Sequence, residues 1–137
     1  LAKTLKLLRK VRKDALQIVD LDPKVYLDVL KTYAGTKKIS EKEKKNHFID
    51  EALGNSFRLQ ANLALLVTMA KEAVGSLEGT IPGSIANDLR VSRSLLEAAF
   101  KGACHTAEIN RVYMKDPRRK ERAGRALEEV KRRFASE

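Results

Sequence analysis

Apolar side chains recur at three- and four-residue spacings along most of the chain, which is typical of amphipathic helices. The first helix is predicted from Leu1 to about Val19, with basic residues on its other face. Asp22 and Pro23 predict the start of a second helix, because proline in a first turn lacks only an N–H that has no helical partner. Gly35 is predicted to end that helix.

A third helix is predicted to begin at Ser40, which forms a capping box with Glu43. Gly54, Asn55 and Ser56 interrupt its pattern and predict a kink or a brief break. The following segment, residues 57–74, is apolar almost all round, so it is predicted to be a central helix covered on several sides. A link from Gly79 to Gly83 follows.

The longest uninterrupted helical pattern runs from Ser84 to Asp116, with Ser84 as the predicted N-cap. One stripe of this helix carries small side chains and predicts a close seam with a second helix. Its members are Ser92, Ala99, Gly102, Ala103, Thr106 and Asn110. Asp116 and Pro117 repeat the Asp-Pro start, and a basic last helix is predicted to run to about Ala135, with Ala126, Val130 and Phe134 on its inner face.

These elements predict an all-α fold, an antiparallel multi-helix bundle of five helices that forms a single domain over residues 1–137. Hydrophobic residues make up 43% of the chain, which is enough for a core, but aromatic residues make up only 5%. Helices with so few aromatic residues often complete their burial at a symmetric interface, so we expect a homodimer or a larger homo-oligomer.

The chain carries a net charge of +10, concentrated in its first and last helices. Two solvated helix faces would account for this charge, and so would attraction of an anionic ligand. No aromatic side chains for base stacking lie among the C-terminal basic residues, which argues against nucleic acid. With one cysteine, Cys104, no signal peptide and no apolar run long enough to span a membrane, a cytoplasmic location is the default expectation.

Several residues of the longest helix carry a family resemblance: Asp88, Val91, Gly102, Ala103 and Asn110, with Lys115 and Asp116 behind them. They resemble the C-terminal signature of the formiminotetrahydrofolate cyclodeaminase family, and upstream segments 21–26 and 40–43 look like two of its helix starts. The resemblance covers nearly the whole chain. Members begin with a long small-residue helix after a Pro-Gly-Gly-Gly-Ser turn, which this sequence lacks. They also usually have Asn at the position of Thr106 and Ser at that of Asn87.

The resemblance implies that Asp88 and Asn110 are catalytic, whereas helix capping and an interhelical hydrogen bond are their structural alternatives. Arg90 and Arg93 are candidates to clamp a glutamate carboxylate of the substrate, and Thr106 and Asn87 complete the candidate substrate-binding set. Asp88 and Asn110 are separated by about 33 Å along one helix, from a rise of about 1.5 Å per residue. One site that uses both therefore needs an antiparallel copy of the helix from a second chain.

The implied reaction is the cyclisation of 5-formiminotetrahydrofolate to 5,10-methenyltetrahydrofolate with release of ammonia, without a metal or redox cofactor. A methenyltetrahydrofolate cyclohydrolase is an alternative from the same family. A non-catalytic basic helical module that binds an acidic partner or nucleic acid is an alternative from another class. The substrate would be a folate, including forms with several glutamates.

Overall fold

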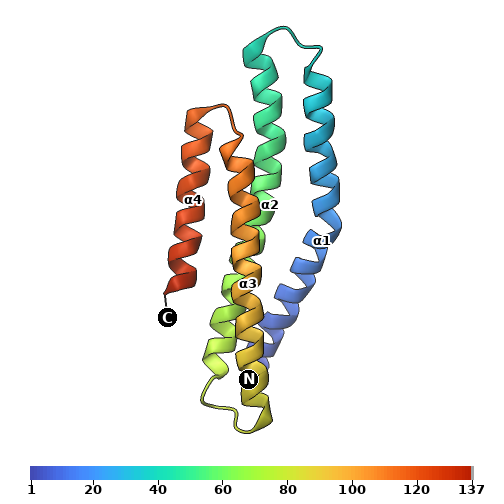
Figure 1. The fold of residues 1–137 in the computed structure, drawn as a ribbon. Coiled ribbons are helices and arrows are strands. Elements are labelled where there is room, and N and C mark those ends of the chain that lie inside the picture. Colours follow the sequence, from blue (N-terminus) through green and yellow to red (C-terminus); the bar gives the residue numbers. More distant parts are fainter. Residues whose placement is uncertain (137) are drawn as a thin grey trace.

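A computed structural model describes residues 1–136, which fold into four helices and no strand. They are α1 (Ala2–Thr36), α2 (Lys42–Leu77), α3 (Ser84–Val112) and α4 (Pro117–Ala135). Successive helices run antiparallel, as Figure 1 shows. The predicted all-α antiparallel bundle is confirmed, and the prediction of five helices is wrong.

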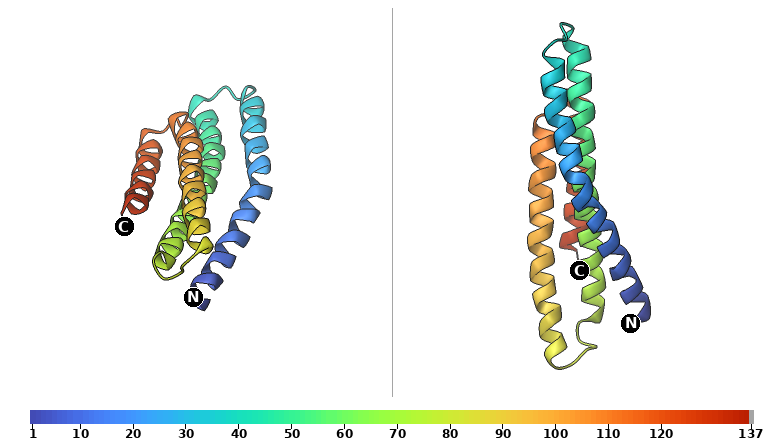
Figure 2. Two further views of the ribbon diagram at one scale, coloured as in Figure 1. Left: turned by 60° about the horizontal axis from the view of Figure 1, so that its bottom comes forward. Right: turned by 90° about the vertical axis from the view of Figure 1, so that its right-hand side faces the viewer.

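The first two predicted helices are one continuous helix, α1, with Pro23 in its interior. Proline removes a hydrogen bond and crowds the carbonyl four residues earlier, so it bends a helix that packing holds together. The two views of Figure 2 show this bend in α1. Val11, Ile18 and Val29 are buried on both sides of the proline, and Gln60 of α2 donates a hydrogen bond of 2.8 Å to Asp22 beside it. Contacts with α2 therefore keep α1 intact where the sequence predicted a boundary.

The break predicted as one alternative at Gly54 is absent, because α2 runs without interruption through this segment. Gly54 and Ser56 are buried, so they are small residues at packed positions of a central helix. Packing here outweighs the low helix propensity of glycine, which costs about 1 kcal/mol relative to alanine. The prediction of a central helix is confirmed, since α2 contacts α1, α3 and α4.

Of the four predicted N-caps, Asp22 lies inside α1 and two others are also wrong. Helix α2 begins at Lys42 after Glu41, which makes no side-chain capping bond, so Ser40 and Glu43 form no capping box. Helix α3 begins at Ser84 itself, and its N-cap is Gly83 with a φ of 78°. Only glycine adopts that conformation readily, which moves the boundary one residue upstream. The Asp116 cap is confirmed, because its side chain accepts the amide of Arg118.

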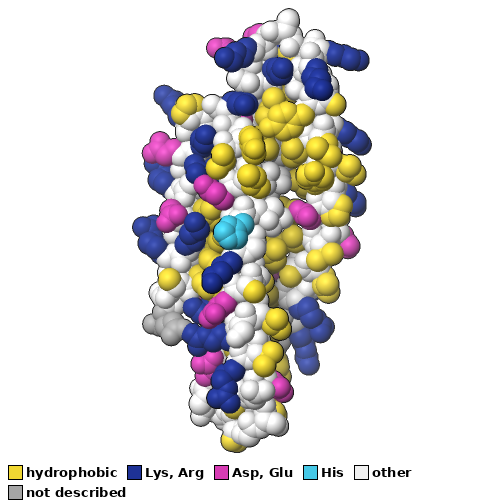
Figure 3. All heavy atoms as spheres, viewed as in Figure 1, with side chains coloured by type: hydrophobic (Ala, Val, Ile, Leu, Met, Phe, Trp, Pro, Cys, Tyr) yellow, Lys and Arg dark blue, Asp and Glu magenta, His cyan; other side chains and the backbone are white. Residues whose placement is uncertain are grey.

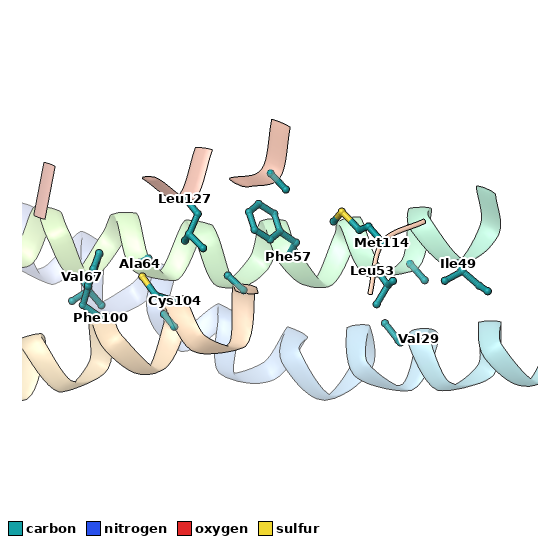
Figure 4. Packing of buried hydrophobic residues seen from close by; sticks show 14 residues of the cluster. Val29, Ile49, Leu53, Phe57, Ala64, Val67, Phe100, Cys104, Met114 and Leu127 are labelled. Carbon is teal, nitrogen blue, oxygen red and sulfur yellow. The ribbon is translucent and has the colours of Figure 1, made fainter. Parts of the chain in front are cut away.

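The core lies along α2, as Figure 4 shows. Val29 of α1 lies opposite Leu53 near one end, and Val67 meets Phe100 of α3 near the other. On the α4 side, Leu127 is 1% exposed. The ring of Phe134 stacks on that of Phe100 with centroids 3.8 Å apart. Of the predicted inner face of α4, Val130 and Phe134 are partly buried against the core, whereas Ala126 is exposed. Leu127 takes the central position instead.

Candidate functional site

The two candidate catalytic residues lie far apart on the same helix. Asp88 is exposed near the start of α3, and Asn110 is partly buried near its end. Because α3 is continuous between them, the distance of about 33 Å expected from the helical rise applies, and one copy cannot bring both to a single substrate.

Thr106 and Asn110 lie together, one helical turn apart. The Thr106 hydroxyl donates to the carbonyl of Gly102 at 3.1 Å, and the Asn110 side-chain amide donates to the carbonyl of Thr106 at 2.8 Å. Both hydrogen bonds stay within α3 and fix the orientation of these side chains. Asn110 therefore does not make the interhelical hydrogen bond considered as its structural alternative.

The candidate anion-binding residues lie at the Asp88 end of α3. Arg90 and Asn87 are exposed. Arg93 donates to both carboxylate oxygens of Glu78 at 3.1 and 3.2 Å and lies 3.8 Å from Glu97. Arg93 is therefore bound to carboxylates of this chain. Of the two arginines, Arg90 is the one whose guanidinium group faces solvent, and it lies within one turn of Asp88 along α3.

The predicted small-residue seam is not formed within the described chain. Ala103 is buried, but Ala99, Gly102 and Thr106 are exposed. A Cβ atom added at Gly102 would meet no atom within 4 Å. The sequence identified small residues that permit a close approach, but no helix of residues 1–136 makes it.

Large apolar side chains surround this open seam. Helices α1 and α3 both pack on α2 but do not contact each other. We call the following set of exposed residues the α1–α3 apolar face: Leu16, Val19, Tyr26, Leu30 and Tyr33 of α1, and Val91, Leu95, Ile109 and Tyr113 at α3. In Figure 3 hydrophobic side chains gather in the upper right, over α1 and the adjoining edge of α3.

Exposure along this face is high: Val19 is 65% exposed and Leu95 is 67% exposed. Burial, then the charge of Asp50 and the nearby Tyr113 raise the pKa of Tyr33 above its usual value. Clusters of exposed large apolar side chains are typical of binding or assembly surfaces.

Two of the basic residues of α4 hold it against α2. Arg119 forms a 2.5 Å ion pair with Glu51, and Arg133 forms a 2.7 Å ion pair with Glu72. The hydrogen bond from Arg133 holds the pKa of Glu72 below its usual value, although burial opposes this shift. Part of the basic C-terminal segment is therefore a structural contact between helices.

Cys104 is buried, and burial is the main cause that raises the pKa of its thiol. His105 is exposed on another side of α3. Among the described residues no three His, Cys, Asp or Glu side chains lie together as metal ligands. No helix within residues 1–136 is long and apolar enough to cross a membrane.

Sequence reasoning missed a buried carboxylate, Asp50 of α2, which is 2% exposed. Its two oxygens accept the backbone amides of Lys115 and Asp116 at 2.7 and 2.8 Å. It therefore fixes the turn between α3 and α4. The sequence did hold a signal for this buried carboxylate, because Asp50 lies between the apolar residues Ile49 and Leu53 of a predicted helix.

The fold and the open seam define a class of protein: a bundle of long antiparallel helices with an uncovered apolar face beside its candidate polar residues. The sequence pattern of the formiminotransferase-cyclodeaminase family matches residues 1–129, and the chain belongs to that family. Membership places it among domains related to folate one-carbon enzymes. No curated protein and no solved structure matches the chain.

Proposed function

We propose that this chain converts 5-formiminotetrahydrofolate to 5,10-methenyltetrahydrofolate and ammonia. The observation that carries the proposal is the family match over residues 1–129. In this reaction N10 of the folate attacks the formimino carbon, and a C–N bond forms. The bond from that carbon to the formimino nitrogen then breaks. N10 loses its proton, and the departing nitrogen gains protons and leaves as ammonia.

Asp88 and Asn110 are the residues proposed to act on the reacting atoms. A carboxylate is suited to accept the N10 proton and to return it to the leaving nitrogen, since one group then serves both steps. The amide of Asn110 is already oriented by its bond to Thr106, and an oriented amide can position the formimino group for attack. These roles need no metal or redox cofactor.

We further propose that a second copy of the chain completes the site. Asp88 and Asn110 are too far apart within one copy, but an antiparallel α3 from another copy would place Asp88 of one chain beside Asn110 of its partner. The exposed positions Ala99, Gly102 and Thr106 would permit the close approach of the backbones. The α1–α3 apolar face would be buried in the same contact, which favours association.

Arg90 is proposed to bind a glutamate carboxylate of the folate, because its guanidinium is exposed within one turn of Asp88. Arg93, already paired with Glu78 and Glu97, is proposed to support this region through those ion pairs and to contact the substrate when it arrives. Asn87 and Thr106 are proposed to contribute the remaining hydrogen bonds to the substrate.

The test is the absorbance of methenyltetrahydrofolate over time in two cuvettes. The first contains 5-formiminotetrahydrofolate and the protein, and the second contains the methenyl compound and the protein. Accumulation in the first cuvette is expected. Asp88→Asn should abolish it, whereas the exposed control Asp20→Asn on α1 should retain the wild-type rate.

The other outcomes identify other functions. Accelerated loss of the methenyl compound in the second cuvette alone would assign cyclohydrolase activity and contradict the cyclodeaminase proposal. If folded protein causes no change in either cuvette, the alternative of a non-catalytic basic helical module that binds an acidic partner or nucleic acid is favoured. Binding of nucleic acid would then weaken steeply with ionic strength, and charge reversal at Arg118, Arg119 and Arg122 would abolish it.

A further inference from the structure

A pocket of about 390 Å³ lies between α2 and α4, and none of the candidate folate residues lines it. Its lining includes Phe57 and Met114, which are 5% and 6% exposed and form an apolar floor. Three guanidinium groups, from Arg58, Arg119 and Arg122, line it as well. The volume lies within the range of small-molecule sites, about 300–1,000 Å³.

Two of these guanidiniums are held in place by α2. Arg119 is paired with Glu51 at 2.5 Å. Arg58 donates a hydrogen bond to the side-chain oxygen of Asn55, a neutral partner. A Cβ atom at Gly54 would make only an ordinary van der Waals contact with this guanidinium, at 3.5 Å. The hydrogen bond to Asn55 orients Arg58.

Arg122 lies about one turn beyond Arg119 on α4 and is exposed. It forms no hydrogen bond or ion pair with any residue in the described part of the chain. Arg58 and Arg122 thus bring two guanidinium groups from two helices to one pocket.

The lining carries three guanidinium groups and two carboxylates, which leaves one positive charge in excess. Both oxygens of Asp50 accept backbone amides, and Glu51 is paired with Arg119. The hydrogen bond and then the charge of Arg119 lower the pKa of Glu51 most, and His47 and Arg58 lower it further. The pocket therefore favours an additional negative group.

We propose that this pocket binds a small organic anion. Arg58 and Arg122 hold its phosphate or carboxylate, since guanidinium groups match the geometry of both. A flat apolar part of the ligand lies on Phe57 and Met114. The site is separate from the proposed folate site and does not depend on cyclodeaminase activity.

The experiment is a titration of the full chain with phenyl phosphate, followed by amide chemical shifts in two-dimensional NMR. Saturable shifts are expected at Gly54, Met114 and Ala123, which line the pocket. Benzoate should cause shifts at the same amides if a carboxylate serves as well as a phosphate. Inorganic phosphate should bind more weakly, because it lacks the apolar part that covers the floor.

The double variant Arg58→Gln, Arg122→Gln should weaken phenyl phosphate binding by about tenfold or more. The matched control is Arg125→Gln, Arg132→Gln, which removes the same charge from exposed positions outside the pocket and should leave the affinity near that of the wild type. Equal weakening in both double variants, or shifts spread over the basic surface, would overturn the proposal. Equal affinity for inorganic and phenyl phosphate would overturn the role of the apolar floor.

Discussion

Asp50 is the buried carboxylate whose removal should cost the most stability among the polar residues of this fold. Its oxygens accept two backbone amides, those of Lys115 and Asp116. Hydrogen bonds to charged groups contribute about 1.5–3 kcal/mol each. Water can reach the freed amides in part, because Lys115 and Asp116 are exposed. We therefore expect Asp50→Ala to lower the free energy of unfolding by about 3 kcal/mol, the lower limit for the loss of two such hydrogen bonds.

Asp50→Asn should cost about half as much as Asp50→Ala, because its amide oxygen still accepts one backbone N–H while its NH₂ group faces the other. The assay is urea unfolding followed by far-ultraviolet circular dichroism at one fixed protein concentration, since association changes apparent stability. Asp20→Ala is the control, an exposed carboxylate of α1 whose loss should change stability by less than about 0.5 kcal/mol. An Asp50→Ala cost no larger than that of the control would refute this reasoning.

Three further predictions concern the core, the ion pairs and the thiol. Leu127→Ala should lower the free energy of unfolding by about 2–5 kcal/mol, because Leu127 is 1% exposed, whereas the partly exposed Leu21→Ala should cost far less in the same urea titration. Hydrogen bonds from arginines lower the pKa values of Glu51, Glu72 and Glu108 in the folded protein. These carboxylates therefore stabilise the fold fully above the ordinary carboxyl pKa of 4.5, and this stabilisation is lost as the pH falls through their lower folded-state pKa values. A variant with glutamine at all three positions should therefore lose less stability on acidification than the wild type, and a parallel acid titration of the two proteins checks this. Cys104, buried and with a raised pKa, should react with a thiol reagent many times more slowly in the native protein than in urea, and equal rates would show that the helix opens readily.

The sequence predicted the helical class and the central place of α2 because apolar periodicity directly reports which residues share a helix face. It placed a helix boundary at Pro23 because local rules treat proline as a start or a stop. The structure keeps one helix there, since buried residues on both sides and the Asp22–Gln60 hydrogen bond hold it to α2. Contacts between residues far apart in the chain decided that boundary, and single-sequence patterns do not contain them.

Periodicity also does not say which apolar face is covered. Their three- to eight-residue spacings place Leu5, Val11 and Val19 on one apolar stripe of the first helix. Val11 is buried, but Leu5 and Val19 are 40% and 65% exposed. The small-residue seam of α3 was identified from its residue types, yet its partner helix is absent from the described chain. Both differences are explained if part of the apolar surface packs against another copy of the chain.

For the candidate site, helix geometry alone predicted that Asp88 and Asn110 cannot meet within one chain. The structure supports this prediction, because α3 is one continuous helix between the two residues. The pairing of Arg93 with Glu78 was not predictable, because it depends on how the link between α2 and α3 folds back. The hydrogen bond between Asn110 and Thr106 follows their four-residue spacing and was within reach of sequence reasoning.

The central claim is a folate site that takes Asp88 from one copy and Asn110 from another. Its most direct test mixes the inactive variants Asp88→Asn and Asn110→Ala under conditions in which subunits exchange. Each mixed dimer would have one site with both mutations and one site with neither. Cyclodeaminase activity should therefore return to about a quarter of the wild-type value when half of the dimers are mixed. No recovery of activity, with exchange verified and the wild type active, would contradict the shared site.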